Sequence, residues 1–257
     1  MNTNIKQIQT SSTPLRSGPS LDFSIETECL FGESIETIEL KNNFVFCKCI
    51  IDDYKGWVDI YDIGSFRKNT HKIITLRSFV YKLPDIKSTI IFDLPYGSQV
   101  SVQSILNDWA EIFLKEDLFG FVPLKHIIDI EKTIKDWVFV AEQFINTPYK
   151  WGGRNSIGID CSALIQLSLQ AAGILIPRDT KEQEKMKWKE ISKISMLERG
   201  TLVFWKGHIG VMTDQNNLLH ANGYSMSVKK EPLKQVINRH TKNNIGEITR
   251  MIVYELN

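Results

Sequence analysis

The sequence has 257 residues, 42% of them hydrophobic and 24% charged, which is ordinary for a globular protein. With 31 Lys and Arg residues against 30 Asp and Glu residues, the net charge is +1, so the bulk charge gives no reason to expect nucleic acid or an anionic membrane as a partner. The N-terminal stretch lacks an apolar core of signal-peptide length, and no later run is long enough to span a bilayer. We therefore expect a cytoplasmic chain without membrane association. We also expect a monomer.

The chain begins with a polar stretch and continues with short β-type runs. Residues 1–19 are rich in Ser, Thr and Asn, which predicts a flexible arm. From about residue 20 to 130, alternating runs are separated by turn signals, with no sustained helical period. Cys47 and Cys49 lie in one such run, "NNFVFCKCII", where a two-residue spacing puts both on one face of a strand. Since no second Cys or His pair stands near them, we predict core packing there and not a metal site.

Two segments of this region follow the same order of turns and strands. The first runs from "LFGESIETIEL" to "YKGWVDI", and the second runs from "LPYGSQVSVQSIL" to "LFGFVPLKHI". Each has a glycine turn, two strands, an acidic turn and a third strand with Gly-aromatic-Val, as a small antiparallel barrel needs. Both segments resemble the bacterial SH3-like domain, which places one barrel at 20–68 and another at 69–129. A single β-sandwich over the same residues is the alternative.

After residue 130 the pattern changes from alternating to helical. Apolar residues recur at helical spacing from Ile134 to Ile145, and Pro148 ends that stripe. A second helix is predicted from Cys161, in "CSALIQLSLQAAG", with Gly173 as its C-cap. Beyond a Lys-rich segment, "GTLVFWKGHIGVMTDQNNLLHANG" alternates as strands interrupted by turns. Residues 130–257 therefore predict an α+β domain with helices first and a sheet after them.

A cysteine at a helix start and two histidines on strands form the candidate chemistry. The unpaired N–H groups and the positive dipole end of a helix start favour a thiolate at Cys161, and Asp160 can cap the same helix. His208 and His220 lie on consecutive predicted strands, twelve positions apart. In an antiparallel hairpin they share a face only if the connecting loop has an odd number of residues or a bulge shifts the register. Gly210 then lies on the face of His208 and leaves room beside the imidazole.

The C-terminal part resembles the NlpC/P60 family of papain-like cysteine peptidases. The resemblance rests on "PYKWGG", "GIDCSALIQ", "IPRDTKEQ", "RGTLVFWKGHIGV" and "LLHANG". It implies a papain-like α+β catalytic domain in which Cys161 is the nucleophile, His208 the general base and His220 the residue that orients His208. It also implies that Tyr149 of "PYKWGG" helps to bind the oxyanion. Neither a metal nor a cofactor is implied.

The order of domains, two SH3-like domains followed by such a catalytic domain, resembles that of the subgroup that cleaves murein (peptidoglycan) peptides. The resemblance implies hydrolysis of the bond from γ-D-glutamate to the diamino acid, in murein tripeptides or tetrapeptides with a free N-terminal L-alanine. Asp160, Ser162 and Asp179 are the matching positions for the ammonium end of that substrate. Glu33 and Tyr54 are candidates for a wall that restricts the cleft to short peptides.

Two other functions stay open at the level of sequence. The same Cys and His residues also suit an amidase or acyltransferase that acts on a non-murein acyl group. The other alternative is a non-catalytic wall-binding protein, in which the SH3-like domains anchor an inert C-terminal domain.

Overall fold

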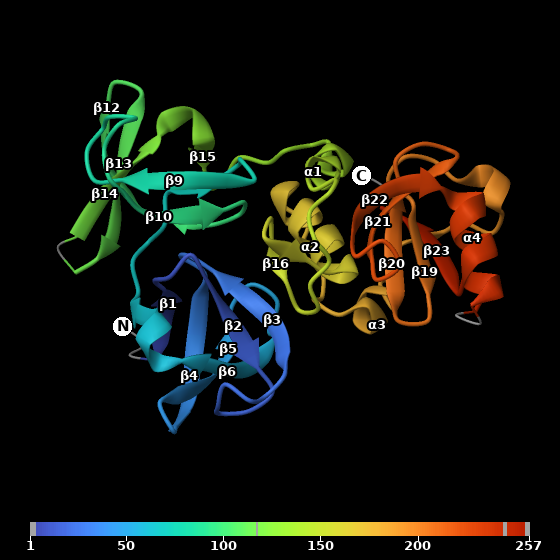
Figure 1. The fold of residues 1–257 in the computed structure, drawn as a ribbon, viewed down its shortest axis with the longest axis horizontal. Helices are drawn as coiled ribbons and strands as arrows, with labels where there is room; N and C mark the ends of the chain where they lie inside the picture. Colours follow the sequence, from blue (N-terminus) through green and yellow to red (C-terminus); the bar gives the residue numbers. More distant parts are fainter. Residues whose placement is uncertain (1–3, 117, 244–245, 255–257) are drawn as a thin grey trace. The chain divides into compact units, whose positions relative to one another are not determined.

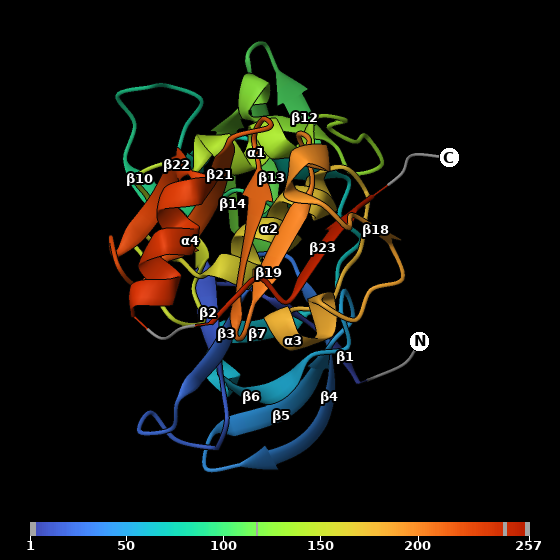
Figure 2. The ribbon, with the colours of Figure 1, turned by 90° about the vertical axis from the view of Figure 1, so that its right-hand side faces the viewer.

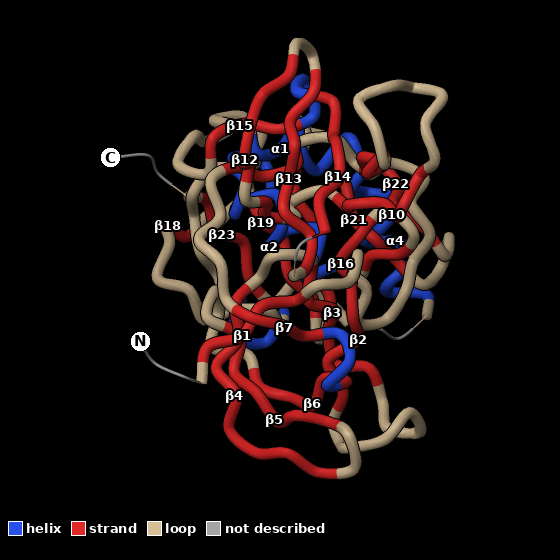
Figure 3. Tube along the Cα trace, turned by 90° about the vertical axis from the view of Figure 1, so that its left-hand side faces the viewer, coloured by secondary structure: helices blue, strands red, loops and turns tan. Residues whose placement is uncertain are grey.

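A computed structural model describes residues 4–116, 118–243 and 246–254, and the chain forms two compact units. Unit 1 contains residues up to Lys132 together with Arg154–Ser156, and unit 2 contains the rest. Figure 1 traces the chain by colour, and Figure 3 shows that strands and loops make up most of the part that ends at β15. No described helix has the length and hydropathy that a membrane span requires.

The first half of unit 1 is one seven-stranded antiparallel sheet in the order β3-β2-β6-β5-β4-β1-β7. Its core holds Cys47 and Cys49, which are 0% and 5% exposed, so the prediction that these thiols pack in a core is confirmed. The elements are β1 (Ile5–Ile8), β2 (Ser12–Arg16), β3 (Ile25–Leu30), β4 (Ser34–Lys41), β5 (Phe44–Cys49), β6 (Lys55–Asp59), the 3₁₀ helix η1 (Ile60–Asp62) and β7 (Ile63–Ser65).

The N-terminal stretch is part of this sheet, so the prediction of a flexible arm over residues 1–19 is wrong for its described part. β1 pairs with β4 and β7, and β2 pairs with β3 along its length. Ile8 and Leu15 are 1% and 0% exposed in the same core as Cys47. A few inward-pointing apolar side chains with complete backbone pairing stabilise a strand even in a polar sequence.

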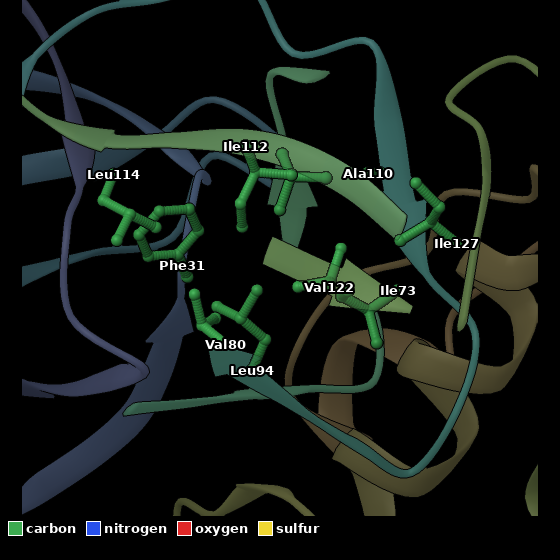
Figure 4. Close-up of a cluster of buried hydrophobic side chains, with 10 residues drawn as sticks. Phe31, Ile73, Val80, Leu94, Ala110, Ile112, Leu114, Val122 and Ile127 are labelled. Carbon is green, nitrogen blue, oxygen red and sulfur yellow. The ribbon is translucent and has the colours of Figure 1, made fainter. Parts of the chain in front are cut away.

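The second half of unit 1 combines a five-stranded sheet, β10-β9-β14-β13-β12, with a three-stranded sheet, β11-β8-β15. Alternate residues of β13, Ala110, Ile112 and Leu114, point into one core, as expected for a strand with one buried face. Figure 4 shows that Phe31 from the first half reaches the same core. The elements are β8 (His71–Ile73), β9 (Arg77–Tyr81), β10 (Ile90–Pro95), β11 (Gln99–Val100), β12 (Val102–Leu106), β13 (Trp109–Lys115), β14 (Leu118–Pro123), η2 (Leu124–His126), β15 (Ile127–Asp129) and, later in the chain, β16 (Arg154–Asn155).

Unit 2 packs helices against a six-stranded antiparallel sheet in the order β18-β23-β19-β20-β21-β22. Helix α2 packs on β20 and β21, and helix α4 packs on β22. Figure 2 shows α4 beside the sheet, and residues of α4 belong to an apolar cluster of this unit. The elements are α1 (Trp137–Gln143), β17 (Gly158–Ile159), α2 (Cys161–Ala171), α3 (Thr180–Gln183), β18 (Lys189–Glu190), η3 (Ile194–Met196), β19 (Leu202–Trp205), β20 (His208–Met212), β21 (Asn217–Asn222), β22 (Ser227–Pro232), α4 (Leu233–Lys242) and β23 (Arg250–Val253).

Local capping explains where the first two helices begin and end. Helix α1 begins at Trp137, later than the apolar stripe from Ile134, because Asp136 caps it by accepting from the Phe139 N–H. Helix α2 ends at Ala171 with Ala172 as its C-cap, and Gly173, the predicted cap, follows one residue later with φ of +80°.

Candidate active site

Cys161 is the first residue of α2 and is almost completely buried. Asp160 caps the helix by accepting from the Ala163 N–H at 2.8 Å. The Cys161 sulfur lies 3.8 Å from Thr180 Oγ1, and the thiol is 7% exposed. Burial, and next the negative charge of Asp160, raise the pKa of the Cys161 thiol to about 11, against smaller opposite effects of Thr180, the Ile209 N–H and Arg178. Desolvation thus opposes the thiolate that the helix start favours at Cys161.

Asp160 is held by Arg178, which was not among the predicted site residues. The Arg178 guanidinium donates to both carboxylate oxygens, at 3.0 and 2.6 Å, and to Ser162 Oγ at 2.7 Å. The Gly152 N–H donates to Asp160 as well, at 3.0 Å. Asp160 and Ser162 are therefore brought together beside Cys161, with the Asp160 charge already balanced by Arg178.

Asp179 and Tyr149 lie on segments next to these residues. Asp179 is exposed and precedes α3, whose N-terminus its side chain does not cap. Tyr149 donates its backbone N–H to Met226 O at 2.9 Å and forms a parallel bridge with Ile159. Burial, and then the nearby Cys161 and Asp160, raise the pKa of the Tyr149 phenol, so its O–H stays a donor at neutral pH.

The two histidines meet across the hairpin of β20 and β21. Met212 pairs with Leu218, so five residues, 213–217, connect the paired positions. This odd number satisfies the parity condition, and His208 Nε2 lies 2.7 Å from His220 Nδ1. Gly210 lies against His220, because a Cβ on this glycine would stand 3.0 Å from His220 Cβ. The prediction that these three residues share a face is confirmed.

Among the described residues, the ring hydrogen bond of His208 goes to His220, and no hydrogen bond joins His208 to Cys161. Burial, and then the nearby His220 and His240, lower the pKa of His208 well below its ordinary value. These two shifts favour a neutral thiol and a neutral imidazole in the resting site. Catalytic hydrogen bonds are often long or poorly aligned before substrate binds, so this geometry is compatible with a Cys-His pair.

A carboxylate and a guanidinium lie next to His220, on the side away from His208. Glu231 Oε1 lies 2.9 Å from His220 Nε2, and Arg239 of α4 donates to both Glu231 oxygens at 2.8 and 2.7 Å. These partners lower the pKa of Glu231 to about 2, with Arg239 the larger cause and His220 the next. Nothing in "KKEPL" marks Glu231 as a site residue, because only the register of β21 with β22 brings it beside His220.

The two residues expected to wall the cleft belong to unit 1. Glu33 is 5% exposed and accepts two hydrogen bonds, both of 2.9 Å, from the Arg154 guanidinium. Tyr54 packs against the core of the first sheet. Their role toward a substrate stays a prediction. Among the described residues, no group of three or more His, Cys, Asp or Glu side chains is arranged to hold a metal ion.

Comparisons with known proteins agree with this geometry. The model of the NlpC/P60 family matches residues 146–245. Dipeptidyl-peptidase 6 of Lysinibacillus sphaericus is 28% identical over 225 residues, which are 79% of this chain and 82% of that protein. The gamma-D-glutamyl-L-lysine dipeptidyl-peptidase of Bacillus subtilis is 24% identical, over 86% of this chain and 80% of its own length. The solved structure of an NlpC/P60 family protein from Bacillus cereus has the same fold, with a TM-score of 0.81 and 18% identity over 97% of this chain and 99% of that one.

The family match supports the predicted NlpC/P60 domain over residues 146–245, and the relatives that cover about four-fifths of the chain carry the names of peptidases. The matches also confirm a catalytic domain preceded by a largely β region, without deciding the type of the N-terminal barrels. The chain carries an NlpC/P60 family domain.

Proposed function

We propose that this chain is a cysteine peptidase that hydrolyses the bond between γ-D-glutamate and the diamino acid in murein tripeptides or tetrapeptides with a free N-terminal L-alanine. The observation that carries the proposal is the buried Cys161 at the start of α2, in the same unit as the hydrogen-bonded pair His208 and His220. The names of relatives that match about four-fifths of the chain support the substrate class.

The charge states of the resting site determine the first step of the proposed mechanism. With a thiol pKa of about 11 and an imidazole pKa below its ordinary value, both groups are neutral at pH 7. His208 therefore accepts the thiol proton while the Cys161 sulfur attacks the amide carbonyl. The Tyr149 O–H and the backbone N–H groups at the start of α2 donate to the oxyanion that forms.

The second step releases the two products. The His208 imidazolium donates its proton to the leaving amine of the diamino acid, and the thioester of Cys161 remains. A water molecule then loses a proton to His208 and attacks the thioester, which releases the L-Ala-D-Glu dipeptide and returns the proton to sulfur. No other reactant is needed.

For the N-terminal end of the substrate, we propose Asp160, Ser162 and Asp179 as binding residues. Because Arg178 already balances the charge of Asp160, a substrate ammonium there shares that carboxylate with the guanidinium. Asp179, the exposed carboxylate that follows Arg178, supplies the additional negative charge in this proposal.

We also propose that the two halves of unit 1 are the SH3-like barrels expected over 20–68 and 69–129, with β1 and β2 added to the first. The two halves support this by ending alike, with a strand, a 3₁₀ helix and a short strand: β6-η1-β7 in the first and β14-η2-β15 in the second.

The test compares L-Ala-γ-D-Glu-L-Lys with the same peptide acetylated at its N-terminus. We expect release of the L-Ala-D-Glu dipeptide from the free peptide, about 100-fold slower cleavage of the acetylated one, and no cleavage by Cys161→Ala. Cleavage of both peptides at equal rates contradicts the recognition of a free amine. If neither is cleaved while another amide is turned over, the amidase alternative holds. Absence of any Cys161-dependent turnover favours the wall-binding alternative.

A further inference from the structure

His220 Nε2 faces one group that can only accept a hydrogen bond and one that can only donate. Glu231 Oε1 lies 2.9 Å away, and its pKa of about 2 leaves the carboxylate ionised, so it can only accept a hydrogen bond. Asn222 Nδ2 lies 3.1 Å away on the same nitrogen. The orientation of that amide is determined, because Asn222 Oδ1 accepts from the Ser225 N–H at 2.8 Å and from Ser225 Oγ at 2.9 Å. The amide nitrogen that faces His220 can only donate.

Each of these neighbours requires a different tautomer of His220. If the proton is on Nε2, it is donated to Glu231, and Nδ1 accepts from His208 Nε2 across the 2.7 Å contact. If the proton is on Nδ1, Nε2 accepts from Asn222, and Nδ1 donates to His208 Nε2. In the first state the His208 proton is on Nε2, and in the second it is on Nδ1.

We infer that Glu231 is a positioning residue that sets the tautomer of His220 and, through it, leaves Nδ1 of His208 free to act as the base. His208 Nε2 is hydrogen-bonded to His220, so only Nδ1 can receive the thiol proton. The inference therefore rests on the proposed function, in which His208 accepts that proton. Asn222 favours the opposite state, in which His208 Nδ1 already carries a proton.

Glu231 prevails over Asn222 for electrostatic reasons. A hydrogen bond to an ionised carboxylate is roughly twice as strong as one between neutral groups. The competing tautomer also points the Nε2 lone pair at a carboxylate oxygen 2.9 Å away, which is repulsive. His220 is fully buried, so solvent does not weaken this preference. Arg239 holds the carboxylate in place from α4 through two hydrogen bonds.

The register explains why Glu231 reaches this position. His220 pairs with Lys229 across β21 and β22, so Glu231 lies two residues further along β22 on the same face. The strand ends one residue later at Pro232, and α4 begins at Leu233. Glu231 is therefore placed between the His220 ring and the Arg239 side chain of the following helix.

The test is ¹⁵N NMR of the full chain labelled at histidine, which reports the protonated nitrogen of each ring. We expect both His208 and His220 to carry the proton on Nε2 in the wild type. In Glu231→Leu we expect both to move to Nδ1, with kcat about 100-fold lower and KM changed little. Glu231→Leu/Asn222→Leu removes both demands and is expected to recover part of kcat.

Glu190→Leu is the matched control, because Glu190 also pairs with an arginine of unit 2, Arg250. We expect this variant to leave the tautomers of both histidines and kcat unchanged. A wild type with the proton on Nδ1 of either ring overturns the inference, and so does a folded Glu231→Leu with unchanged tautomers. Should that variant not fold, Glu231→Gln and the wild-type spectrum decide, with a mixture of tautomers expected in the former. The spectra do not depend on activity, so failure of the proposed function is seen separately.

Discussion

Gly210→Ala is expected to damage the protein through one added methyl group. A Cβ at this position would lie 2.9 Å from Leu218 Cγ and Cδ1 and 3.0 Å from His220 Cβ. Carbon atoms in ordinary contact are about 3.5–4.0 Å apart, so both neighbours must move. Both side chains are 0% exposed, so they can move only within a close-packed core. His220 is also held by its hydrogen bonds to His208 and Glu231.

The size of the effect follows from this geometry. Overpacking of a close-packed core costs about 1–3 kcal/mol, and the lower entropy of alanine in the unfolded chain returns about 0.5–1 kcal/mol. A net loss of about 0.5–2 kcal/mol lowers the Tm by roughly 2–8 °C for a unit of this size. A displacement of His220 by a few tenths of an ångström is passed to His208, and we expect kcat to fall about 10- to 100-fold.

The assay pairs thermal unfolding, followed by circular dichroism, with cleavage of L-Ala-γ-D-Glu-L-Lys. Gly223→Ala is the matched control, because a Cβ at Gly223 meets nothing within 4 Å among the described residues. We expect its Tm and kcat to stay close to those of the wild type. A Gly210→Ala protein with the stability and activity of Gly223→Ala refutes the claim that Gly210 makes room for His220.

Three further predictions concern charge. Arg178→Gln leaves the Asp160 carboxylate buried without its counterion, and we expect a loss of about 3 kcal/mol in the free energy of unfolding measured with urea; an unchanged value contradicts the proposed balance. Alkylation of Cys161 by iodoacetamide is expected to be slow at pH 7 and to rise about tenfold per pH unit toward its pKa of about 11, whereas a plateau below pH 8 indicates a thiolate. Because the pKa values of His208 and His220 are lowered in the folded chain, the unfolded chain binds more protons below about pH 6.5. The free energy of unfolding should therefore fall as the pH drops through that value, by up to about 1.4 kcal/mol per pH unit for each histidine. Denaturation with urea at pH 7.5 and 5.5 measures this slope, and a flat profile excludes it.

The sequence by itself determined the features that depend on neighbouring residues or on strand parity. Asp160 before Cys161 and Gly173 after α2 mark the ends of the nucleophile helix, because caps are made within a few residues of a helix end. The twelve-residue spacing of His208 and His220 restricted the hairpin to an odd loop, because side chains alternate strictly along a strand.

Only the tertiary structure decided the charge and the partners of these groups. The pKa of the Cys161 thiol is raised by burial, which no local pattern in the sequence shows. Arg178 and Glu231 reach Asp160 and His220 from other elements of unit 2, so their roles depend on strand register and helix packing. The N-terminal strands were also decided by tertiary structure. Leu15 lies in a polar segment whose composition predicts a flexible arm, but the sheet buries this side chain and thereby stabilises a strand.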